Sequence, residues 1–86
     1  MPQISKFLGI IIRMFYDDHS PPHFHAIYNE YSAIIDIEKL ELWSGHLPPR
    51  ILGLVVEWAA IHQNELFQNW DKATKKEKLI QIDPLV

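Results

Sequence analysis

Apolar and polar residues alternate through most of the first half of the chain, and a period of two residues is typical of β-strands. Between residues 4 and 17 the alternation places a mostly apolar set on the face expected to pack on the helix: Ile10, Ile12, Met14 and Tyr16. Arg13 falls on the opposite face. The pattern and the turn residues that interrupt it predict one or two strands over residues 4–17, with Gly9 as a bulge or a tight turn, and further strands over residues 23–28, 31–38 and 40–43.

The pattern changes to a helical period after Pro48-Pro49, and proline suits the first turn of a helix. An apolar stripe follows: Ile51, Val55, Trp58, His62 and Leu66. We therefore predict one helix over residues 49–70 and a tail over 76–86. Residues 1–86 are expected to form a single α+β domain, a three- to four-stranded antiparallel meander packed by one long helix in the C-terminal half.

Composition narrows the class of protein. The chain has 86 residues, a net charge of −3 and no cysteine. A small secreted domain usually needs disulfides, so a cytoplasmic location is expected. The longest apolar run, Phe7 to Ile12, is too short to span a membrane. The negative charge argues against non-specific binding to nucleic acid, although RNA held through a few contacts stays open.

The stretch from Asp17 to Ala26 holds three of the five histidines. Side chains at positions i and i+2 of a strand point the same way, so His23 and His25 are expected to face one site. These two histidines, with His19 and Asp17, would then complete a ligand set for zinc or another divalent transition metal.

The same histidines permit a second interpretation. Imidazole is suited to both general acid and general base catalysis near neutral pH, so His23 and His25 would act on a phosphate without a metal. Arg13 would hold the phosphate, with His19 and Tyr16 as supporting groups. This would be a ribonuclease-type site.

A third interpretation is a histidine-rich turn without chemistry, ordered by hydrogen bonds to Asp17 or Asp18. The residues alone leave all three interpretations open, and with them whether the protein is an enzyme.

A different class of function is suggested by the predicted helix. Val56, Phe67 and Trp70 lie to one side of its apolar stripe. If the sheet leaves them exposed, they form an apolar flank suited to a small partner protein or to a second copy of the chain. The alternative to a catalytic site is therefore a binding module or homodimer that uses this flank.

Several short motifs run along the chain: Pro2-Gln3-Ile4-Ser5-Lys6-Phe7, Gly9-Ile10-Ile11-Ile12-Arg13-Met14, Tyr16-Asp17-Asp18-His19, Pro21-Pro22-His23-Phe24-His25-Ala26, Leu47-Pro48 and Glu57-Trp58. Together they resemble the bacterial domain-of-unknown-function family 4160. The resemblance runs from Pro2 to about Leu85, and the run D-H-x-P-P-H-F-H is its most specific part.

The resemblance implies a short bacterial or archaeal protein, often encoded beside a small protein of the domain-of-unknown-function family 2442. That arrangement is similar to a toxin–antitoxin pair, and it transfers no catalytic residues. The leading hypothesis is a component of a toxin–antitoxin-like module with a ribonuclease-type site at His23 and His25.

Overall fold

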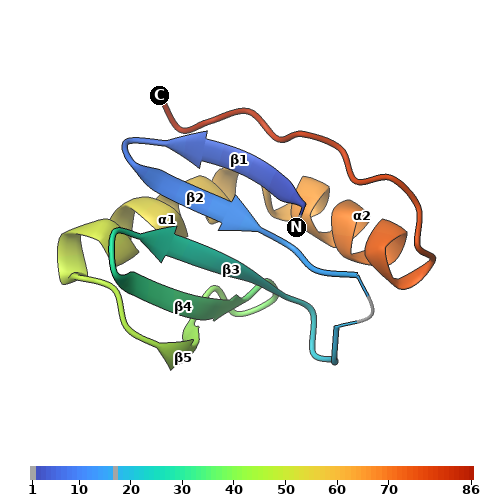
Figure 1. The fold of residues 1–86 in the computed structure, drawn as a ribbon, viewed down its shortest axis with the longest axis horizontal. Coiled ribbons are helices and arrows are strands. Elements are labelled where there is room, and N and C mark those ends of the chain that lie inside the picture. Colours follow the sequence, from blue (N-terminus) through green and yellow to red (C-terminus); the bar gives the residue numbers. More distant parts are fainter. Residues whose placement is uncertain (1, 17) are drawn as a thin grey trace.

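Five strands form one antiparallel sheet in the order of the chain, and two helices cover one of its faces (Figure 1). The computed structural model describes residues 2–16 and 18–86. The strands are β1 (Gln3–Phe7), β2 (Ile10–Arg13), β3 (His23–Tyr28), β4 (Tyr31–Asp36) and β5 (Leu42–Gly45). The α+β class is confirmed, and the predicted number of three or four strands is wrong.

The extra strand arises because the predicted stretch 4–17 is a hairpin. Leu8 and Gly9 form its turn, with φ angles of 52° and 79°. Two positive φ angles match the right-handed twist of adjacent strands, so the chain reverses within two residues. β2 then ends at Arg13, and the connection to β3 contains a cis peptide between Ser20 and Pro21.

The register of the central strands shows which side chains share the buried face of the sheet. Ala26 of β3 lies opposite Ile12 of β2 and Ala33 of β4, and all three are buried. Side chains that face each other across antiparallel strands share one face of the sheet. The apolar face predicted from Ile10, Ile12 and Met14 is therefore confirmed, and Ala26 and Ala33 continue it across β3 and β4. Tyr16 departs from it, because its side chain is 40% exposed beyond the end of β2.

The predicted single helix is wrong, because the chain forms α1 (Pro49–Ile61) and α2 (Gln63–Thr74). His62 lies between them with φ −110° and ψ 24°, outside helical geometry. The Gln63 amide donates to the carbonyl oxygens of Ile37 and Glu38, at 2.7 and 3.0 Å. These bonds attach the start of α2 to the chain just after β4, and the bend lets both helices bury apolar residues against the sheet.

Among the residues that the structure describes, no helix combines the length and the apolar character that a membrane span requires. The chain after α2 runs back along the domain beside β1 (Figure 1). The Ile82 N–H donates to the Ile4 carbonyl at 2.8 Å, and the side chains of Leu79 and Ile82 are buried. The tail thus adds to the core without forming a sixth strand.

Two glycines allow a matched test of backbone geometry. A Cβ at Gly45, where φ is +86°, would lie 2.3 Å from the Ser32 carbonyl oxygen. Gly45→Ala should therefore lower the free energy of unfolding by roughly 2–4 kcal/mol. Gly53→Ala should raise it by about 0.5–1 kcal/mol, because this exposed helical position has open space around it. Urea unfolding curves measure both, and equal effects of the two substitutions would contradict the prediction.

Candidate functional site

Asp18, His23 and His25 come together at the start of β3. The carboxylate atom Oδ2 of Asp18 lies 2.8 Å from Nε2 of His23 and 3.2 Å from Nε2 of His25. The three candidate ligand atoms lie within 4.8 Å of one another. Alternation along β3 brings the two imidazoles to one side, as the sequence predicts, and the ring centroids are 5.4 Å apart.

His23 is the buried member of this cluster, with 3% of its side chain exposed. Its ring packs against Trp43 of β5 and Trp70 of α2, with centroid distances of 5.0 Å to each. Its Nδ1 lies 2.8 Å from the Pro21 carbonyl oxygen. Both ring nitrogens of a buried imidazole therefore face oxygen atoms.

The two oxygens impose a condition on the charge of the cluster. A neutral imidazole has one N–H donor and one acceptor nitrogen, whereas a carbonyl and a carboxylate only accept. If Nδ1 of His23 donates to Pro21, its Nε2 lone pair points at the carboxylate of Asp18. Unmatched polar groups in a buried position are costly, so the cluster needs one additional positive charge at this point. A second proton on His23 or a bound metal ion would supply it.

A metal ion fits the arrangement if the side chains adjust, because the three candidate ligand atoms lie within 4.8 Å of one another. Ligand atoms about 2.0–2.1 Å from a tetrahedral zinc ion are about 3.3–3.4 Å apart. The two contacts of the Asp18 carboxylate, 2.8 and 3.2 Å, are slightly shorter than that. A histidine that ligates a metal usually donates its other N–H to a carbonyl or carboxylate. The contact between His23 Nδ1 and the Pro21 oxygen has this form.

The charge of Asp18 is itself stabilised. Burial alone would raise the pKa of the Asp18 carboxyl, but the hydrogen bonds that it accepts outweigh this cost and hold its pKa below the usual value. The backbone N–H of His19 donates to Oδ1 at 2.9 Å, and the rings of His25 and His23 contact Oδ2. The carboxylate is therefore available as a ligand throughout the neutral range.

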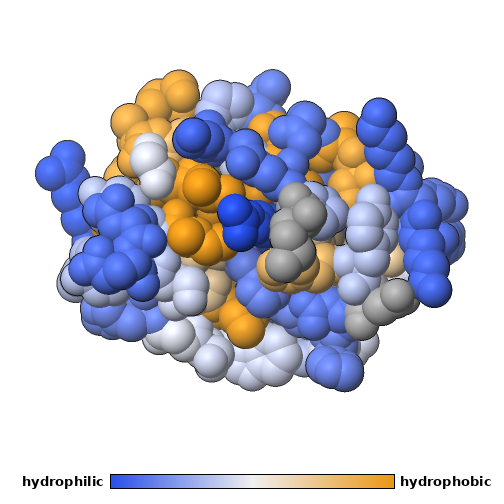
Figure 2. Space-filling view, in the orientation of Figure 1, coloured by the Kyte–Doolittle hydropathy of each residue, from blue (hydrophilic) through white to orange (hydrophobic). Residues whose placement is uncertain are grey.

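Arg13 lies beside this cluster on the open face of the sheet. It is the direct partner of His25 in the β2–β3 register, so the two side chains point to the same face. The ring of Phe15 also packs against His25, with centroids 4.4 Å apart. Figure 2 looks onto this face and shows apolar surface near its middle among hydrophilic side chains.

The other predicted site residues are not brought into the cluster. The side chain of His19 is exposed, and its backbone N–H caps Asp18. Tyr16 makes no hydrogen bond to the cluster in the described part of the chain. Asp17, the predicted carboxylate ligand, lies outside the described residues. The sequence pattern did not predict Asp18 as the ligand, because strand alternation does not say which of two adjacent aspartates in a turn faces a site.

The apolar flank predicted on the helix is smaller than expected. Trp70 is only 8% exposed because it packs against His23, so its expected exposure is wrong. Val56 and Phe67 are half-buried. A partner protein or a homodimer at this flank stays a prediction.

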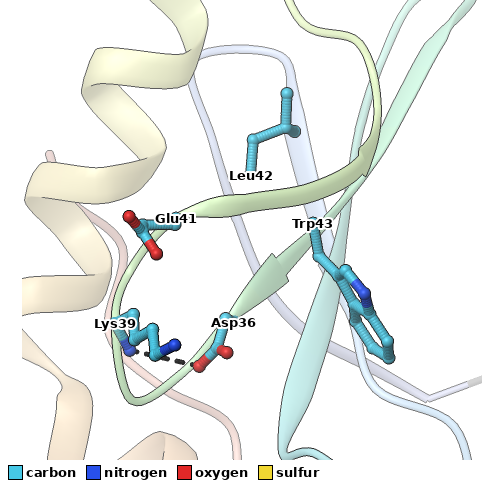
Figure 3. Close-up of a pocket in the computed structure, with 5 residues that line it drawn as sticks. All are labelled: Asp36, Lys39, Glu41, Leu42 and Trp43. Atoms are coloured by element: carbon cyan, nitrogen blue, oxygen red, sulfur yellow. Dashed lines mark hydrogen bonds between the residues drawn. The ribbon is translucent and has the colours of Figure 1, made fainter.

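A pocket of about 260 Å³ adjoins the cluster at the turn between β4 and β5 (Figure 3). Its walls are Asp36, Lys39, Glu41, Leu42 and Trp43. Asp36 faces His23 across β3 and β4, and Trp43 packs against the same ring. One oxygen of Asp36 accepts the backbone N–H groups of Glu38 and Lys39, at 2.8 and 3.1 Å. The pocket therefore places negative charge on the β4 side of the cluster.

Comparison with known proteins gives one match. Residues 9–71 match the family model described as "Domain of unknown function (DUF4160)". No curated protein and no solved structure matches the chain.

The lowered pKa of Asp18 predicts that the free energy of unfolding depends on pH in the acidic range. Its ionised form stabilises the folded state above the ordinary carboxyl pKa, about 3.9, and this contribution is lost as the pH falls through the lowered pKa. In EDTA, Asp18→Asn should lower the free energy of unfolding at about pH 6, and the deficit should shrink towards about pH 3. Urea titrations of the two proteins measure it, and a deficit that stays constant over this range would refute it.

Proposed function

Because the chain belongs to a family whose description assigns no activity, we propose its function from the site alone: it binds one divalent transition metal ion through Asp18, His23 and His25. Two imidazoles and one carboxylate suit zinc and other first-row metals of intermediate softness. The described residues offer no thiolate, since the chain has no cysteine.

One observation carries this proposal. The Nε2 atoms of both histidines converge on one carboxylate oxygen, while Nδ1 of His23 already faces a backbone carbonyl. A single cation among the three ligand atoms satisfies both imidazoles and the carboxylate at once. A second proton on His23, with His25 donating its own Nε2–H to the same oxygen, supplies the same charge, so metal titration is the measurement that separates the two states.

The metal site would keep an open position. Three protein ligands with a fourth place for water are typical of catalytic zinc, whereas structural zinc usually has four protein ligands. The side chains of Asp18 and His25 are 22% and 23% exposed, so solvent reaches this side of the cluster. A bound ion would lower the pKa of a water ligand there and act as a Lewis acid.

Melting temperature tests the proposal directly. Zinc at a hundredfold excess over its dissociation constant should stabilise the folded protein by about 2.7 kcal/mol, roughly 10 °C or more for a domain of this size. The increase should appear at about pH 7.5 and vanish at about pH 5, where histidine is ordinarily protonated and cannot ligate. Differential scanning fluorimetry measures both conditions.

Two histidine variants serve as matched controls. His25→Ala removes a half-buried ligand and should abolish the zinc-dependent increase. His46→Ala removes an exposed histidine outside the cluster and should retain it. If zinc raises the melting temperature of His25→Ala as much as that of the wild type, the site lies elsewhere.

A second candidate function is supported by the position of Arg13. A metal-independent ribonuclease-type site needs a cation beside an acid–base group, and Arg13 is the cross-strand partner of His25. The burial of His23 beneath two tryptophans argues against this candidate, because an acid–base pair requires both imidazoles to reach the substrate.

An RNA cleavage assay in EDTA separates the two candidates. The ribonuclease candidate predicts cleavage that persists in the chelator and falls at least about a hundredfold in His25→Ala. An absence of cleavage by the wild type in EDTA would dispose of it. Membership of a toxin–antitoxin-like module stays a prediction drawn from the family resemblance.

A further inference from the structure

We infer that the metal ion and Arg13 together bind one phosphate group, either as inorganic phosphate or as the end of a phosphate ester. This inference rests on the proposed metal site and names the class of ligand that would occupy its open position.

The first support is the placement of Arg13. It is directly opposite His25, and directly opposed residues on antiparallel strands have Cβ atoms about 4.5–5.5 Å apart on one face. The side chain is half-buried, and its guanidinium makes no hydrogen bond or ion pair with the described residues. A guanidinium held at a fixed strand position beside three converging ligands is suited to an anion.

The second support is the charge of the loaded site. A divalent ion, the Asp18 carboxylate and Arg13 add to a net charge of about +2, with both ligating histidines neutral. A phosphate monoester carries about −1.5 to −2 near pH 7, whereas a carboxylate carries only −1. The dianion therefore compensates the site more completely than a carboxylate would.

The third support is the direction of the surrounding charges. Asp36 faces His23 from β4, and Glu41 and Lys39 line the pocket on that same side, so two carboxylates and one ammonium leave it with a net negative charge. Arg13 approaches from β2, on the other side of β3. An anion is thus repelled from the β4 side and attracted to the β2 side. The guanidinium fork can hold two phosphate oxygens while a third takes the open metal position.

Cobalt(II) provides the test, because its visible absorption reports the ligands of the ion. The protein is loaded with cobalt at about pH 7.5 and titrated separately with inorganic phosphate, phenyl phosphate and acetate. Phosphate and phenyl phosphate should change the spectrum at concentrations well below those of acetate. The tighter of the two identifies the source, free phosphate or ester, and either order supports the inference.

The matched variants are Arg13→Gln and Lys6→Gln. Both remove one cation from the open face, but Lys6 lies opposite Ile11 on β1, away from the cluster. Arg13→Gln should raise the phosphate concentration needed for half of the spectral change by about tenfold or more. Lys6→Gln should leave it near the wild-type value. Melting curves of both variants verify that they fold.

The outcomes separate this inference from the proposed function. If cobalt gives no ligand-field spectrum with the wild type, the metal site is wrong and the phosphate inference falls with it. If cobalt binds but phosphate leaves its spectrum unchanged, or Arg13→Gln responds like the wild type, only the phosphate inference is overturned. An equally strong response to acetate would also overturn it.

Discussion

The register of β3 is the constraint on which the site depends. Successive side chains of a strand point to opposite faces, so Phe24 and Ala26 enter the core from one side of β3 while His23 and His25 take the other. On that side His23 is still buried, against Trp43 and Trp70. A shift of one residue would expose the apolar pair and bury both imidazoles in the core. The hydrophobic effect that fixes β3 in the sheet therefore also aims the histidines at Asp18. No separate stabilisation of the site is required to orient them.

His23 links the site to the helical layer. Its ring lies between Trp43 of the edge strand and Trp70 of α2, and its Nδ1 faces the connection before β3. An imidazole in such a place loses water on every side, which is costly unless its nitrogens are matched. The carbonyl of Pro21 and the carboxylate of Asp18 provide matches only when the cluster carries an extra positive charge. Packing of α2 on the sheet therefore leaves a buried site where one additional positive charge, such as that of a metal ion, would be stabilising.

The side chains on the two sides of β3 differ in charge, so the site is positive towards one neighbouring strand and negative towards the other. Arg13 stands on the β2 side, while Asp36 and the pocket it lines stand on the β4 side. The connection that carries Asp18 joins β2 to β3, so the carboxylate, the cation and the imidazoles come from one hairpin and its loop. A rigid hairpin with a functional loop is a common way to hold a site in a small domain.

Local patterns in the sequence were enough to predict the bounds of β3, the apolar face that includes Ile10, Ile12 and Met14, and the common direction of His23 and His25. These features follow from local periodicity, which side-chain alternation imposes whatever the rest of the chain does. Within the helical segment, periodicity predicted the apolar stripe but not the break at His62. That break coincides with bonds from Gln63 to carbonyl oxygens near the end of β4.

The folded domain was needed to show that Asp18 is the carboxylate that meets the histidines, that Arg13 lies beside His25 and that Trp70 is buried. Each of these depends on how separate segments meet: a turn whose side-chain directions follow no period, a pairing between two strands, and a helix docked on a sheet. Contacts of this kind are set by packing across the whole domain, so no pattern within a single segment contains them.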